Sequence, residues 1–124
     1  LSQGPCVIKR LRGCGAGCEY VAITPEGDIY PCHQFVGLEE YKLGSVHEGT
    51  FDQSLSERFA GLNIYTRDEC RACWARFYCS GGCSASNLLV NGDIKRPHQI
   101  GCELERKRLE CAIALKAIDA GLSE

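Results

Sequence analysis

Short runs of β-branched and aromatic residues alternate with glycine-rich stretches in the first third of the chain. Residues 20–24 and 28–30 are two such runs, and the sequence Pro-Glu-Gly separates them. Proline presets φ for a turn, and glycine accepts a positive φ. This pattern predicts an N-terminal β-hairpin.

The middle of the chain shows one short helical pattern and one cysteine-rich segment. Residues 52–60 predict a short central helix, with Ser54 and Glu57 spaced as a capping box and Gly61 as its C-terminal cap. Residues 70–83 are too rich in Cys and Gly for a long regular element. We interpret them as a ligand-bearing loop with a helical turn or two.

The strongest helical periodicity lies near the C-terminus. It predicts a helix that begins at Cys102 and ends at Gly121, with one apolar face formed by Leu104, Cys111, Leu115 and Ile118. We interpret Cys111 on this face as a small buried apolar residue. A helix N-terminus lowers the pKa of a thiol, which favours a metal-binding thiolate at Cys102. The predicted fold is an irregular α+β domain over residues 1–124: hairpin, short helix, Cys-rich loop and C-terminal helix.

Composition narrows the class of protein. The chain has 124 residues, 44% of them hydrophobic, which suits one small domain, and its ten cysteines make cysteine chemistry the basis of the scaffold. A net charge of −2 without a long basic run argues against nucleic acid as a partner. We see no signal peptide or membrane segment, and we expect a cytoplasmic protein. Because the chain begins at Leu1 and contains no Met, we expect it to be part of a longer protein.

Three kinds of cysteine chemistry compete. Disulfides need an oxidising compartment, for which the sequence gives no secretory signal. A zinc module would use four sulfur atoms in one tetrahedral site, whereas a [4Fe-4S] cubane takes one thiolate per iron from a wider spread of chain. The spacing within residues 70–83 alone leaves zinc and iron open.

Cysteine spacing over the whole chain is wide and specific. Cys14, Gly27 and Cys32 form C-X12-G-X4-C, residues 70–83 form C-X2-C-X5-C-X3-C, and Cys102 follows after a gap. This order resembles the SPASM domain, which lies C-terminal to the barrel of radical SAM peptide and protein maturases. Residues 14–37 and 70–76 further resemble the thioether-forming maturases of cysteine-rich ribosomal peptides, including the ranthipeptide group.

The resemblance implies two auxiliary [4Fe-4S] clusters with interleaved ligands. The first cluster would take Cys14, Cys32 and Cys83, with Cys18 as its fourth ligand and Cys6 as the alternative to Cys18. The ligands implied for the second cluster are Cys70, Cys73, Cys79 and Cys102. We interpret His33 and Arg76 as residues that tune the clusters by hydrogen bonding or charge.

Two departures from the family pattern limit the prediction. Sulfatase-type maturases carry an acidic residue directly after the second motif cysteine, whereas this chain has His33 there. This weakens a sulfatase-maturase interpretation. The SAM-cleaving cluster needs C-X3-C-X2-C, and after Cys14 and Cys18 the next required position is Val21. SAM and its cluster are therefore expected in a core domain outside this chain.

The resemblance also implies a function. The parent enzyme would cleave SAM reductively and form a thioether in a precursor peptide. This domain, not catalytic by itself, would relay an electron from an external donor and line the peptide site. The alternatives are another peptide or protein modification, such as sulfatase maturation, and a structural zinc-binding interaction module.

Overall fold

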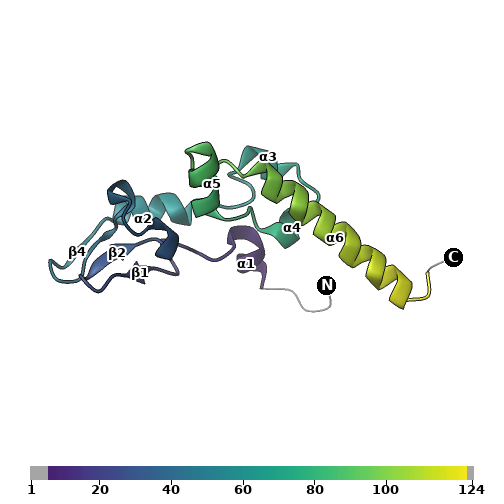
Figure 1. Cartoon of the computed structure of the whole chain (residues 1–124), viewed down its shortest axis with the longest axis horizontal. Coiled ribbons are helices and arrows are strands. Elements are labelled where there is room, and N and C mark those ends of the chain that lie inside the picture. The colour runs from purple at the N-terminus through teal and green to yellow at the C-terminus, as the bar shows by residue number, and fades with distance from the viewer. Residues whose placement is uncertain (1–5, 123–124) are drawn as a thin grey trace.

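The computed structural model describes residues 6–122, and a small antiparallel sheet lies at one end of it (Figure 1). Strand β1, Ala22–Ile23, pairs with β2, Asp28–Tyr30, so that Ala22 lies opposite Tyr30. Gly27 lies in the connecting turn with a φ of +85°, which glycine adopts without strain. The predicted hairpin is confirmed, and sheet and helices together confirm the α+β class.

Two further strands, which the hydrophobic pattern did not predict, extend the sheet. Strand β3, Gly44–Ser45, pairs with β2, and β4, Thr50–Phe51, pairs with β3, giving the order β1-β2-β3-β4. A Cβ atom on Gly44 would collide with the carbonyl oxygen of Thr50, so the approach of these two strands requires glycine.

Helix α2, Gln53–Ala60, is the predicted central helix, but its N-terminal cap differs from the prediction. The side chain of Asp52 accepts a hydrogen bond from the N–H of Leu55 at 2.9 Å. The predicted capping box is wrong because Asp52 directly precedes the helix and its carboxylate reaches the free amide first. Gly61 is the C-terminal cap, as predicted.

Aromatic side chains form the core beside the sheet. Phe35, in the 3-10 helix His33–Phe35, is fully buried. Its ring lies 5.1 Å from that of Tyr41, in the 3-10 helix Glu39–Tyr41, and 5.4 Å from that of Phe59 in α2. Cys32 belongs to the same buried cluster. Core packing therefore fixes the position of one predicted ligand.

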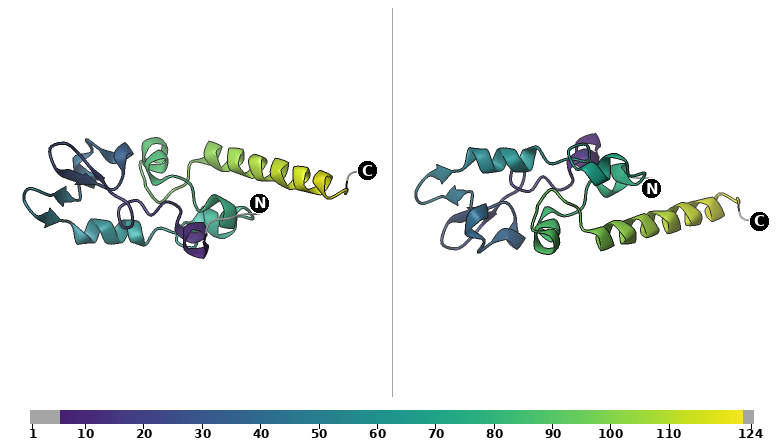
Figure 2. Two further views of the ribbon diagram at one scale, coloured as in Figure 1. Left: turned by 90° about the horizontal axis from the view of Figure 1, so that it is seen from below. Right: turned by 90° about the horizontal axis from the view of Figure 1, so that it is seen from above.

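The remaining helices give the molecule an elongated shape. The sheet and α2 lie at one end, α6 projects from the other, and four short helices lie between them (Figures 1 and 2). These are α1, Val7–Arg12; α3, Asp68–Arg71; α4, Arg76–Cys79; and α5, Ser84–Asn91. The cysteine-rich segment thus contains two helical turns, and α5 is a helix that the sequence pattern did not predict.

Helix α6, Gln99–Asp119, is the predicted C-terminal helix, with two corrections. It begins before Cys102, whose N–H donates to the His98 carbonyl at 3.0 Å within the first turn. The interpretation of Cys111 as a buried apolar residue is wrong, because α6 projects from the body of the molecule and Cys111 is exposed (Figure 1). The buried residue of α6 is Leu109, and the exposed positions include Leu104, Cys111, Leu115 and Ile118. None of the helices within residues 6–122 combines the length and apolar character needed to cross a membrane.

Candidate metal centre

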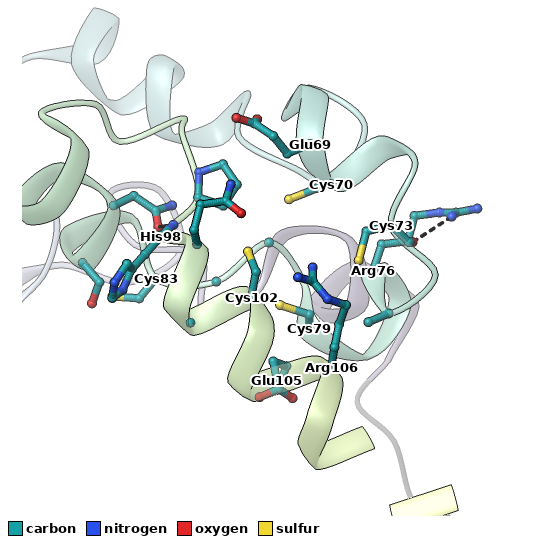
Figure 3. A pocket seen from close by; sticks show the side chains of 18 residues that line it. Glu69, Cys70, Cys73, Arg76, Cys79, Cys83, His98, Cys102, Glu105 and Arg106 are labelled. Atoms are coloured by element: carbon teal, nitrogen blue, oxygen red, sulfur yellow. Dashed lines mark hydrogen bonds between the residues drawn. The ribbon is translucent and has the colours of Figure 1, made fainter. Parts of the chain in front are cut away.

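Five predicted ligands line a common cavity of about 310 Å³ (Figure 3). Four of them are those implied for the second cluster, and the cavity is here called the four-thiol cavity. One water molecule occupies about 30 Å³ of liquid, so the cavity has room for a group much larger than one metal ion. Within residues 6–122, no three His, Cys, Asp or Glu side chains converge closely enough to hold a single ion. Cys70 lies in α3, and Cys73 directly follows the C-terminal cap of that helix. Cys79 ends α4, and Cys102 lies in the first turn of α6.

Burial controls the protonation of Cys70. Cys70 is 7% exposed, and burial raises its pKa to about 11. The positive charge of Arg67 opposes this rise, whereas negative charge on Cys102, Cys79 and Cys73 adds to it. The other three sulfur atoms are therefore within electrostatic reach of Cys70. Because metals bind thiolates, loading this cavity must release protons.

Two arginines, Arg76 and Arg106, line the cavity. The sequence analysis singled out Arg76, but it is Arg106 that points into the cavity. The guanidinium of Arg106 points toward the sulfur atoms (Figure 3). Burial raises the pKa of Cys102, and the charge of Arg106 opposes that rise. Residues four apart on a helix share a face, so the spacing of this pair could have revealed it. The predicted Arg76 instead donates to the Cys73 carbonyl at 3.0 Å and lies 4.7 Å over the Phe77 ring.

A second group of cysteines comes from segments far apart in the sequence. Burial raises the pKa of Cys32, amides of Gln34 and Phe35 oppose the rise, and negative charge on Cys83 and Cys14 adds to it. Two other ligands predicted for the first cluster, Cys83 and Cys14, are therefore within electrostatic reach of Cys32. The core and the end of β2 fix the position of Cys32, and the start of α5 fixes that of Cys83.

Cys83 connects the two groups, because it also lines the four-thiol cavity. Burial raises its pKa, but hydrogen bonds from Ser86 and Ala85, together with the side chain of Gln34, outweigh burial and lower it. The Gln34 Nε2 atom lies 3.8 Å from the Cys83 Sγ atom. A thiolate is thus favoured at the N-terminus of α5, where Cys83 is the N-cap. The sequence analysis predicted a lowered thiol pKa at a helix N-terminus for Cys102, but there the pKa is raised.

The other predicted residues lie at the edges of these groups. Cys18 is exposed and lines a hollow of about 20 Å³ together with Cys14. Its thiol donates to the Gly15 carbonyl at 3.4 Å within its own loop. Cys6 is exposed at the N-terminus of α1. His33 is also exposed. The identity of the fourth ligand in this group stays a prediction.

Comparison with known proteins identifies the domain. Residues 14–74 match the family model of SPASM, described as an iron-sulfur cluster-binding domain. The matched span contains the hairpin, the four-residue helix α3 with Cys70, and Cys73 just after that helix. Residues 14–74 therefore match a SPASM domain, which implies iron–sulfur cluster binding by this part of the chain.

Three relatives illustrate the range of similar proteins. An uncharacterized protein of Archaeoglobus fulgidus is 33% identical over 114 residues, which are 88% of this chain and 25% of that protein. The serine-type anaerobic sulfatase-maturating enzyme of Klebsiella aerogenes is 31% identical over 88 residues, 68% of this chain and 20% of the enzyme. The PqqA peptide cyclase of Xanthomonas axonopodis is 29% identical over 84 residues, 64% of this chain and 22% of the enzyme. The chain thus spans a quarter or less of the length of each relative.

Proposed function

We propose that this chain is the auxiliary domain of a radical SAM maturase that forms thioether cross-links in a ribosomally made precursor peptide. We further propose that it holds two [4Fe-4S] clusters. The observation that carries this proposal is the cavity of about 310 Å³, which is lined by Cys70, Cys73, Cys79 and Cys102 and also by Cys83. Cys83 in turn lies within electrostatic reach of Cys32, another ligand of the first cluster. A cavity of this size suits a multi-iron cluster better than a single zinc ion.

The donor chemistry fits these clusters, because [4Fe-4S] centres are held by Cys thiolates. Cys14, Cys18, Cys32 and Cys83 would hold the first cluster. The second would be held by Cys70, Cys73, Cys79 and Cys102. When bound, such clusters supply one-electron redox chemistry. The protein contributes the thiolates, the surrounding burial and the nearby positive charge.

The proposed roles of the domain are electron relay from an external donor and placement of the precursor peptide. The position of Cys83 beside both groups supports relay, because it keeps the two sites close together. SAM and the cluster that cleaves it would lie in the rest of the parent enzyme. The similarity to a PqqA peptide cyclase supports a peptide as the substrate.

Sulfatase maturation is the second candidate function. Similarity to the Klebsiella aerogenes enzyme over 68% of this chain favours it. Against it stands His33, at the place where sulfatase-type maturases carry an acidic residue. An exposed imidazole in place of a carboxylate changes the proton chemistry available there.

The reaction can be tested with the longer protein that contains this chain. The cluster-loaded protein is incubated anaerobically with SAM, a reductant and a cysteine-containing precursor peptide, and the peptide is analysed by mass spectrometry. Thioether formation removes two hydrogen atoms and leaves one cysteine resistant to iodoacetamide. An aldehyde that reacts with a hydrazine probe would instead establish formylglycine formation. An unmodified peptide, matching the control without SAM, would contradict the proposal.

A further inference from the structure

Arg67 is a buried cation at the junction of the two cysteine groups. It is 3% exposed. Its guanidinium donates to the carbonyl oxygens of Ile94 and Lys95 at 2.7 and 2.8 Å and to the hydroxyl of Ser84 at 3.0 Å. All three acceptors are uncharged. Across residues 6–122, no carboxylate lies within ion-pair distance of this guanidinium.

The position of Arg67 relates it to both groups. It is the N-cap of α3, the helix that carries Cys70. Its side chain packs against the turn before Cys83, because a Cβ atom on Gly81 would lie 3.1 Å from both Cδ and Nε of Arg67. Its third acceptor, Ser84, directly follows Cys83. One side chain therefore contacts the segments that present ligands of both proposed clusters.

A buried charge needs an opposite charge nearby, since burial without a partner is strongly unfavourable. Burial lowers the pKa of Arg67, whereas negative charge on Cys70, Asp93, Cys79 and Cys83 opposes that decrease. Asp93 is exposed, so water and salt screen its charge. The negative charge that faces the guanidinium from the protein side therefore comes from buried Cys70 and half-buried Cys79 of one group and from Cys83, at the surface, of the other.

We propose that Arg67 is a positioning residue shared by both clusters, whose buried positive charge raises the reduction potential of each cluster. This rests on the proposed function, because it requires both clusters. A [4Fe-4S] centre with four thiolates carries a charge of about −2 in its oxidised form and gains one more on reduction. A nearby buried cation stabilises the reduced form more than the oxidised form, because the reduced form carries more negative charge. The reduction potential of the cluster therefore rises.

The test compares Arg67→Gln with Arg71→Gln in the reconstituted chain. Arg71 is a matched control, because it is also near Cys70 in sequence but is exposed and paired with Asp68 at 2.9 Å. Iron per chain is measured first, and midpoint potentials are then determined by redox titration followed by electron paramagnetic resonance. We expect Arg67→Gln to keep the iron content of the wild type while both potentials become more negative. Arg71→Gln should leave both unchanged.

The conservative variant Arg67→Lys keeps the charge but not the forked hydrogen bonds, and it should retain potentials close to those of the wild type. Unchanged potentials in Arg67→Gln, or a change at one cluster alone, would overturn the proposal. If Arg67→Gln does not load, wild-type potentials in Arg67→Lys support it. Loss of clusters from both variants overturns it in favour of a purely hydrogen-bonding role. A wild-type chain without two clusters would instead refute the proposed function.

Discussion

Substitution of Gly17 tests whether core packing holds the loop that carries Cys14 and Cys18. Gly17 has a φ of +83°, and a Cβ atom there would lie 2.7 Å from Cγ of Phe59, which is 4% exposed. The Gly17 N–H donates to the Pro31 carbonyl at 3.0 Å, directly before Cys32. Gly17→Ala therefore pushes the loop away from the core at the first proposed cluster.

Two costs contribute to the expected destabilisation. A left-handed backbone costs an L-residue about 1–2 kcal/mol, and overpacking against a buried ring costs about 1–3 kcal/mol. Gly37→Ala is a matched control, because Gly37 has a φ of +90° and nothing lies within 4 Å of its Cβ position. Gly37→Ala should be destabilised only by the cost of the left-handed backbone. Gly17→Ala also overpacks the core, so it should be less stable than the control by about 1–3 kcal/mol.

The assay is anaerobic urea unfolding of the cluster-free variants, followed by far-ultraviolet circular dichroism, together with iron analysis of the reconstituted variants. We expect Gly17→Ala to unfold at lower urea than Gly37→Ala. We also expect it to keep only the second cluster, about four iron atoms per chain. Equal destabilisation by the two substitutions would refute the reasoning that the core positions this loop.

Three further predictions follow from the structure. Cys102→Ser should reduce bound iron by about half, whereas Cys111→Ser, exposed on the same helix, should not; equal iron in both would contradict the ligand assignment. In the cluster-free chain at pH 9, Cys70, with a pKa of about 11, is about 1% thiolate. Mass-spectrometric mapping should therefore show that Cys70 is alkylated more slowly than Cys83, and the difference in rate should narrow as the pH rises to 11. Equal rates at pH 9 would exclude the raised pKa. Asp52→Ala should lower the free energy of urea unfolding by about 1 kcal/mol through loss of the α2 cap, and an unchanged midpoint would show that the cap contributes nothing.

Local sequence signals predicted the elements that depend on local chemistry. The Pro-Glu-Gly turn specified the hairpin, and apolar spacing specified α2 and α6. Strands β3 and β4 have two residues each, too few for alternation to be visible. Periodicity predicted an apolar face on α6, but it could not show whether this chain covers that face. Leu104 and Leu115 are in fact exposed.

The candidate site was only partly accessible from the sequence. Cysteine spacing and family resemblance gave the ligand groups, and helix spacing could have given Arg106. The contact between Gln34 and Cys83 joins residues 49 positions apart. The burial of Arg67 depends on carbonyl groups of residues 94 and 95. Neither has a local signal, because both arise only when distant segments pack together.

The central claim is that this domain holds two [4Fe-4S] clusters. The most direct measurement is iron, acid-labile sulfide and zinc per chain after anaerobic reconstitution. We predict about eight iron atoms with as many sulfides and no stoichiometric zinc. Zinc without sulfide, or about four iron atoms in the wild-type chain, would contradict the claim.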